Sequence, residues 1–140
     1  DILWRNGSNG KNAVWFMDET TRTGITQLDS TSNLDWNIVG TGDFNSDGQD
    51  DILWRNGSNG KNAVWFMDET TRTGITQLDS TSNLDWNIVG TGDFNSDGQD
   101  DILWRNGSNG KNAVWLMEGT TRIGSSQLDS VNNFDWQPII

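Results

Sequence analysis

The chain has 140 residues and a formal net charge of −11, because Asp and Glu outnumber Lys and Arg by 20 to 9. Nucleic-acid binding needs clustered basic side chains, so this balance argues against a nucleic-acid partner. Cys and His are absent, which excludes disulfides, a thiolate nucleophile and the usual general base. No apolar run approaches the roughly 20 residues of a membrane-spanning helix, so we expect no membrane insertion.

The sequence repeats with a fixed period, and such a repeat determines the architecture before any single residue is interpreted. Residues 1–50 and 51–100 are identical, and residues 101–140 follow the same frame without completing the period. Identity over a whole period indicates recent duplication or engineering. We therefore treat residues 1–140 as a single repeat domain, with repeats at 1–50 and 51–100 and an incomplete third repeat at 101–140.

Each repeat is predicted to contain four short strands, separated by segments rich in Gly, Asn and Ser. In the second repeat we expect strands at 51–56, 62–67, 74–78 and 86–93. The Asn59-Gly60 pair between the first two strands is typical of a hairpin turn, since it tolerates a positive φ.

Two predicted strand segments are continuously apolar, which means that both of their faces must be covered. They lie at 52–54 and 63–67, whereas the third strand is more polar. Four-stranded sheets that are buried on both faces and recur along the chain are typical of stacked propeller blades. The fold class is therefore predicted as all-β, a β-propeller of four-stranded blades with three blade equivalents per chain, and the polar third strand suits the outer edge of a blade.

An acidic loop that occurs twice is the most specific motif. Calcium prefers about six to eight hard oxygen ligands, and each loop alternates Asp or Asn side chains before a Gly at which the backbone can turn. The Gln is expected to offer its main-chain carbonyl, and the last Asp to close the coordination shell. The predicted calcium ligands are Asp43, Asn45, Asp47, Gln49 and Asp51, and Asp93, Asn95, Asp97, Gln99 and Asp101.

Two other interpretations of the acidic loop are weaker. An EF-hand needs a Glu at position twelve of the loop, where this chain has Trp54. A simple Asx-rich turn that binds nothing is the second alternative. The density of acidic residues argues against it, because the carboxylates would repel one another without a cation between them. Asp1 is the last position of a loop whose other residues are absent, so two calcium sites per chain are expected.

The segment Val-Gly-Thr-Gly-Asp-Phe-Asn-Ser-Asp-Gly at 89–98, followed by Asp-Ile-Leu-Trp at 101–104, resembles the FG-GAP or VCBS repeat of integrin α-subunit heads and bacterial surface proteins. The resemblance covers essentially the whole chain. It implies an inner strand at 86–93, a second strand at 101–106 and an extracellular or cell-surface location. The integrin-like Gly-Ala-Pro motif is replaced by Trp-Arg-Asn at 54–56, as in the Trp-rich bacterial versions, so integrin-type ligand recognition is not implied.

Other side chains have one structural and one functional interpretation. Trp54, Trp65 and Trp86 could stack on sugar rings, but Trp in continuously apolar strands more often packs between sheets. Arg55 and Arg72 could orient a ligand, but they are predicted to be surface counter-charges of an acidic protein.

The expected function is that of a non-enzymatic calcium-binding β-propeller module that acts as a structural or binding scaffold. The alternative is a carbohydrate-binding lectin with repeated Trp-lined sites between blades. Asn6-Gly7-Ser8 matches an N-glycosylation acceptor, but it equally suits the hairpin turn. Enzymatic activity is not expected, because identical copies rarely build one asymmetric active site.

Assembly into a closed ring is also predicted. Residues 1–6 correspond to the second strand of a blade and residues 136–140 to the start of an inner strand, so twelve strands would form three blades. Propellers have about four to eight blades, and two chains joined head to tail would supply six. We therefore expect a homodimer with calcium in four of its six inner loops. Pro138 would weaken the junction strand, because it lacks a backbone donor.

Overall fold

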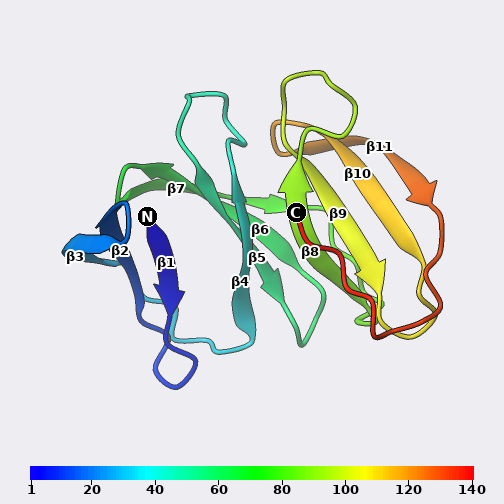
Figure 1. The fold of residues 1–140 in the computed structure, drawn as a ribbon, viewed down its shortest axis with the longest axis horizontal. Helices are drawn as coiled ribbons and strands as arrows, with labels where there is room; N and C mark the ends of the chain where they lie inside the picture. Colours follow the sequence, from blue (N-terminus) through cyan, green and yellow to red (C-terminus); the bar gives the residue numbers. More distant parts are fainter.

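The computed structural model describes all residues 1–140 and consists of β-strands without any helix. The eleven strands are β1 (Ile2–Arg5), β2 (Asn12–Asp18), β3 (Thr21–Leu28), β4 (Trp36–Gly42), β5 (Asp51–Asn56), β6 (Asn62–Asp68), β7 (Thr71–Leu78), β8 (Trp86–Gly92), β9 (Asp101–Asn106), β10 (Asn112–Glu118) and β11 (Thr121–Leu128). Figure 1 shows that they form three separate sheets along the chain.

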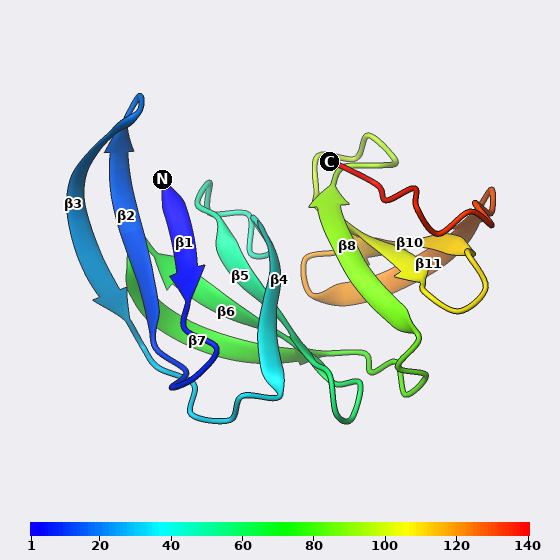
Figure 2. The same ribbon diagram turned by 60° about the horizontal axis from the view of Figure 1, so that its bottom comes forward.

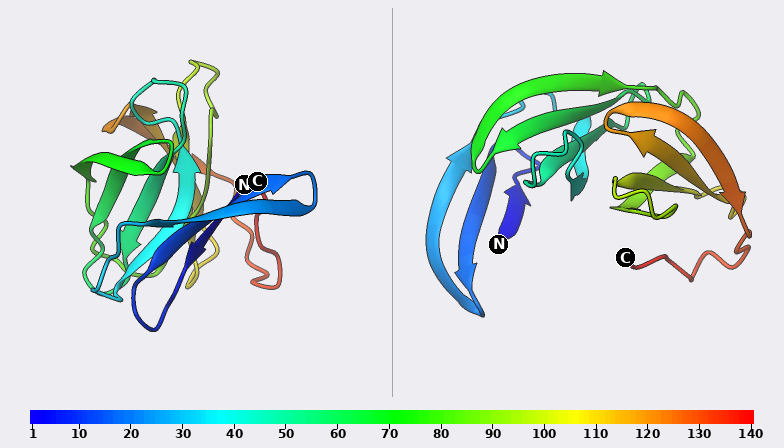
Figure 3. Two further views of the ribbon diagram at one scale, coloured as in Figure 1. Left: turned by 90° about the vertical axis from the view of Figure 1, so that its left-hand side faces the viewer. Right: turned by 90° about the horizontal axis from the view of Figure 1, so that it is seen from above.

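Each sheet is an antiparallel meander in which neighbouring strands follow one another in sequence. The orders are β1-β2-β3, β4-β5-β6-β7 and β8-β9-β10-β11, and none of the sheets closes on itself. The inner edge strands β4 and β8 lie next to each other. Seen from above, the sheets follow one another along an open arc, with both termini on its inner side (Figure 3). This arrangement confirms the prediction of propeller-type blades.

The outer strand β7 is longer than predicted, because it begins at Thr71 instead of residue 74. Its first residues pair with the end of β6, with a register shift between Phe66 and Met67. The Thr73 hydroxyl donates to the Phe66 carbonyl oxygen across this irregularity, at 3.3 Å. A strand at the outer edge of a blade has no neighbour on one side, so polar residues are tolerated there. Because residues 71–73 are polar, the sequence pattern did not indicate that the strand begins at Thr71.

The predicted twelfth strand is wrong, because residues 136–140 form no strand in this structure. β4 and β8 each pair with the strand that follows their acidic loop, whereas these last residues have no such partner in the chain. They nevertheless lie beside β8 in two views (Figures 1 and 2). The outer atoms of the Ile140 side chain lie directly over Gly90 of β8.

The core lies between adjacent sheets rather than within one. Every residue of β5 is buried, because its alternate side chains enter two different cores. Ile52 and Trp54 pack toward the first sheet, and Leu53 packs toward the third. Each sheet is therefore stabilised mainly by its neighbours, as expected of a repeat architecture. This confirms that the continuously apolar strands at 52–54 and 63–67 are covered on both faces.

Candidate functional site

The two acidic loops lie at the same end of the sheets, where β4 passes into β5 and β8 passes into β9 (Figure 1). Each loop thus joins the inner strand of a blade to the second strand, as predicted. The chain turns within the loop through left-handed residues: φ is 61° at Ser46 and 85° at Gly48. Glycine adopts this conformation without a Cβ clash, which explains its position in the motif.

Side-chain oxygens of the first loop accept hydrogen bonds from backbone amides of this turn. The two carboxylate oxygens of Asp43 accept hydrogen bonds from the amides of Asp47, at 3.1 Å, and of Gly48, at 2.9 Å. Asn45 Oδ1 accepts from the Asp47 amide at 3.0 Å. Asp47 Oδ1 accepts from the Gln49 amide at 2.9 Å. Backbone amides of the loop therefore hold the side chains of three of the predicted ligands.

The side chain of Gln49 points away from the loop. Its Oε1 accepts from the Glu69 amide at 2.7 Å, and its Nε2 donates to Asp68 at 3.2 Å. These bonds tie the loop to the turn between β6 and β7. Since the amide side chain is engaged there, only the main-chain carbonyl of Gln49 suits the role predicted from the sequence.

Asp51 is buried at the base of the loop, where it links two elements. Its Oδ2 accepts from the Phe44 amide at 3.0 Å, and its Oδ1 accepts from the Met67 amide of β6 at 2.9 Å. Burial raises the pKa of Asp51, and these two hydrogen bonds oppose the increase. Asp47 and Asp43 add to the increase through charge repulsion. The carboxylate thus belongs both to the fold and to the acidic loop.

The second loop has the same geometry. Asp93 accepts from the amides of Asp97, at 3.1 Å, and Gly98, at 2.9 Å. Backbone donors, the Gly98 amide first among them, lower the pKa of Asp93. In addition, Asp100 of this loop accepts from the Asp43 amide of the first loop at 2.8 Å. This contact between the loops was not predicted. The only signal in the sequence is that each motif ends in two consecutive Asp residues, of which Asp100 makes the contact.

The donors of each loop suit a hard cation, because all the predicted ligand atoms are oxygens. No three acidic side chains lie close enough together to form a metal site by themselves. The predicted set therefore depends on the amide oxygen of Asn45 and the main-chain carbonyl of Gln49 as well as on the carboxylates.

Arg55 is buried, so its predicted role as a surface counter-charge is wrong. One guanidinium nitrogen donates to the Gly60 carbonyl, at 3.2 Å, and to Asn62 Oδ1, at 3.0 Å. The other donates to the carbonyl of Trp86 at 2.8 Å. The guanidinium carbon lies 4.9 Å from the ring centroid of Trp104 in the next blade. These acceptors compensate for the lost hydration, although burial still lowers the pKa of Arg55.

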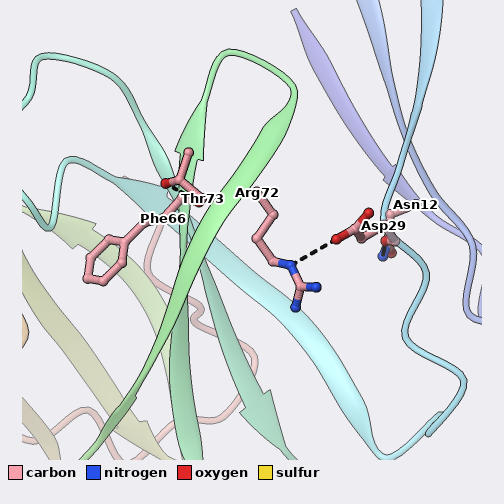
Figure 4. A network of polar contacts seen from close by, with 5 residues as sticks. All are labelled: Asn12, Asp29, Phe66, Arg72 and Thr73. Carbon is pink, nitrogen blue, oxygen red and sulfur yellow. Dashed lines mark hydrogen bonds and ion pairs between the residues drawn. The ribbon is translucent and has the colours of Figure 1, made fainter.

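Arg72 is a counter-charge, as predicted, and it also joins two blades. Its Nε lies 2.8 Å from Asp29 Oδ2 on the segment after β3 (Figure 4). The guanidinium also lies over the ring of Trp65, at 4.8 Å. Arg122 and Asp79 repeat this ion pair between the second and third sheets at 3.0 Å.

A cleft lined by Trp opens between each pair of adjacent sheets. The first has a volume of about 400 Å³, and its lining includes Trp36, Trp54, Trp65 and Arg72. The second, of about 370 Å³, is lined by the corresponding residues Trp86, Trp104, Trp115 and Arg122. Trp54 and Trp65 are largely buried and pack against each other at 4.7 Å between ring centroids, which confirms their predicted packing role.

The chain matches no curated protein and no solved structure. It has no helix of a length and apolarity that would allow it to cross a membrane. Residues 43–104 match the family model of the FG-GAP-like repeat, from the first acidic loop into β9. Repeats of this family are generally non-enzymatic and often extracellular. Together with the repeated antiparallel sheets, this match fits an FG-GAP-like repeat module of the β-propeller type.

Proposed function

We propose that this chain is a non-enzymatic, extracellular or cell-surface scaffold whose blades are stabilised by calcium in the loops at 43–51 and 93–101. The observation that supports the proposal is that Asp43, Asn45 and Asp47 accept backbone hydrogen bonds within one short turn, which brings several side-chain oxygens into the same loop. The same arrangement recurs at Asp93 and Asp97. A catalytic role would need groups that differ between the copies, and the loops repeat the same ones.

Calcium would supply positive charge among carboxylates that repel one another. The positive charge of calcium would affect the stability of the fold most strongly through Asp51. Its carboxylate is desolvated, and it connects the loop to β6 through the Met67 amide. A cation that favours the ionised form of Asp51 would strengthen this connection, because a carboxylate accepts stronger hydrogen bonds than a neutral acid. We therefore attribute a structural role to the metal.

Calcium titration of the metal-free protein should show two sites by calorimetry and raise the melting temperature, and a chelator should reverse the increase. At a free calcium concentration one hundred times the Kd, each site would stabilise the fold by about 2.7 kcal/mol. The double variant Asp47→Asn with Asp97→Asn should weaken binding about tenfold or more, since each loop loses one charged ligand.

The matched control is Asp35→Asn with Asp85→Asn, which removes the same charge from exposed residues outside the loops. Calcium binding by this control should equal that of the unmodified chain. Absence of calorimetric binding, together with a melting temperature that chelator does not change, would contradict the calcium assignment.

Carbohydrate binding in the inter-blade clefts is a second candidate function. The observation that favours it is the recurrence of one cleft with indole and guanidinium groups in its lining. Trp36 and Trp86 are only half-buried, so part of each indole remains open for stacking. The indole N–H groups of Trp54 and Trp104 have no hydrogen-bond acceptor within the chain.

A glycan array should then show reproducible binding to one class of sugar. Trp36→Ala with Trp86→Ala should abolish this binding, because it removes the half-buried indole from each cleft. Leu34→Ala with Leu84→Ala is the control, since it truncates nearby exposed apolar residues that do not line either cleft. If no glycan on the array is bound, the lectin function is contradicted, and the proposal of a calcium-stabilised scaffold is unaffected.

A further inference from the structure

The two acidic loops are in direct contact, although they lie fifty residues apart in the sequence. Asp100 of the second loop accepts a hydrogen bond from the amide of Asp43, the first predicted ligand of the first loop, at 2.8 Å. Asp100 stands between the predicted ligands Gln99 and Asp101 and is not itself one of them. It is therefore a carboxylate of one loop that binds the backbone of the other.

The backbone at the entrance to the first loop is held by both loops. The Asp43 amide donates to Asp100, and the next amide, that of Phe44, donates to Asp51 at 3.0 Å. Two consecutive amides thus bind one carboxylate from each loop. These bonds fix the backbone from which the Asp43 side chain extends.

The position of Asp100 depends on a glycine in the strand that it approaches. Gly42 is the last residue of β4 and is buried. A Cβ at this position would lie 2.7 Å from Asp100 Oδ2 and 3.1 Å from its Cγ. A side chain at residue 42 would therefore push the carboxylate away from the Asp43 amide.

A second link joins the loops through the turn between β10 and β11. Gln99 Oε1 accepts from the Gly119 amide at 2.6 Å. The Phe44 carbonyl oxygen lies 3.1 Å from the place that a Cβ of Gly119 would take. The buried Phe44 side chain packs in the same core cluster as Met117, whose amide donates to Asp101 at 2.9 Å. The first loop thus rests on the residues that hold the second.

The strands that lead into the loops are joined by contacts that do not involve Asp100. The Thr91 hydroxyl of β8 donates to the Thr41 carbonyl oxygen of β4, and the Thr91 methyl group lies against Gly40. β4 and β8 therefore enter the two loops side by side (Figure 1). Removal of the Asp100 carboxylate should leave the two blades stacked.

We propose that Asp100 is a positioning residue for the first loop, which prepares Asp43 for calcium and couples the occupancy of the two loops. This inference rests on the proposed calcium binding. A cation in the second loop would engage the main-chain carbonyl of Gln99 and the carboxylate of Asp101, and would thereby fix Asp100 between them. The fixed carboxylate would hold the Asp43 amide in a charge-assisted hydrogen bond. Coupling of this kind is reciprocal, so calcium in the first loop would also favour binding in the second.

Charges act on the coupling in opposite directions. Cations in neighbouring loops repel each other, whereas Asp100 places a negative charge beside Asp43 and so favours a cation there. Salt screens the repulsion between exposed charges over about 8 Å at an ionic strength of about 0.15 M. The hydrogen bond between Asp100 and Asp43 is partly buried and local, so salt weakens it less. The positive coupling should therefore prevail at this ionic strength.

Calcium calorimetry in two backgrounds measures each loop separately. Asp97→Asn weakens the second loop, so the tighter site is then the first loop, and Asp47→Asn does the reverse. Addition of Asp100→Ala should raise the Kd of the first loop about tenfold, as for loss of an outer-shell partner. It should change the Kd of the second loop by less than about twofold, although Asp100 belongs to that loop, because outer-shell effects act on the ligand that is held.

Two further variants separate the hydrogen bond from the charge. Asp100→Asn should raise the first-loop Kd only about threefold, since its amide oxygen can still accept from Asp43 but carries no charge. Asp85→Asn removes one charge from an exposed residue outside the loops and should leave both Kd values unchanged.

Gly42→Ala tests the same contact from the first loop. It should raise the first-loop Kd about as much as Asp100→Ala, and the combined variant should bind no more weakly than either alone, because both substitutions remove one contact. In the metal-free chain, Asp100→Ala should accelerate hydrogen exchange of the Asp43 amide about tenfold or more, with circular dichroism unchanged.

The unmodified chain should bind its second calcium ion about fivefold more tightly than its first, and Asp100→Ala should abolish this difference. Independent sites in the unmodified chain, equal effects of Asp100→Ala on both loops, or additive effects of Gly42→Ala and Asp100→Ala would overturn the role of Asp100 and leave the calcium assignment intact. Absence of calcium binding by the unmodified chain would overturn both.

Discussion

Gly60→Ala should destabilise the second blade by roughly 3 kcal/mol or more, because it combines a left-handed backbone with a direct steric overlap. Gly60 has a φ of 76°, and a Cβ at this position would overlap with the carbonyl oxygen of Thr81. The same glycine accepts a hydrogen bond from the Thr81 amide at 2.9 Å. The hairpin and the 80–83 segment, which lines the second cleft, therefore depend on this close approach.

Gly57→Ala is the matched control in the same turn. The nearest atoms to a Cβ there lie at 3.8 Å, which is ordinary van der Waals contact. We expect this variant to change the free energy of unfolding by less than about 1 kcal/mol. Urea denaturation monitored by Trp fluorescence measures both. Equal stability of the two variants would show that the approach of Thr81 to Gly60 is not required for the fold.

Arg55→Met should cost about 3–5 kcal/mol, as expected when one partner of a buried polar network is removed. Methionine fills similar volume but removes the guanidinium donor from the carbonyl of Trp86 and from the side chain of Asn62, while the Gly60 carbonyl keeps the Thr81 amide as its donor. The stacking on Trp104 is lost as well. Since these contacts connect the second blade to the third, unfolding should become less cooperative across that boundary.

Arg72→Met is the comparison, because Arg72 also stacks on a Trp and also joins two blades. It is more exposed and has a single ion pair, so we expect a loss of about 1 kcal/mol. Denaturant titration of both variants provides the measurement. A loss at Arg55 no greater than that at Arg72 would contradict the role of the buried network.

The acidic loop was visible in the sequence because its chemistry is local. The alternation of Asp43, Asn45 and Asp47 before Gly48 is enough to predict a sharp turn, and the structure has this turn. The hydrogen bond that Asp51 accepts from the Met67 amide could not be predicted, because Met67 lies on another strand. The contact of Asp100 with the next loop is likewise a consequence of stacking two blades.

The repeat, the order of the strands and the continuously apolar character of the segments at 52–54 and 63–67 follow from the sequence alone, because period and polarity are properties of neighbouring residues. The burial of Arg55 and the different exposure of Trp4 and Trp54 become apparent only in the folded chain. These residues belong to identical repeats, and their surroundings depend on whether another sheet packs against them. Contacts between blades are long-range, and no pattern within one period encodes which faces are covered.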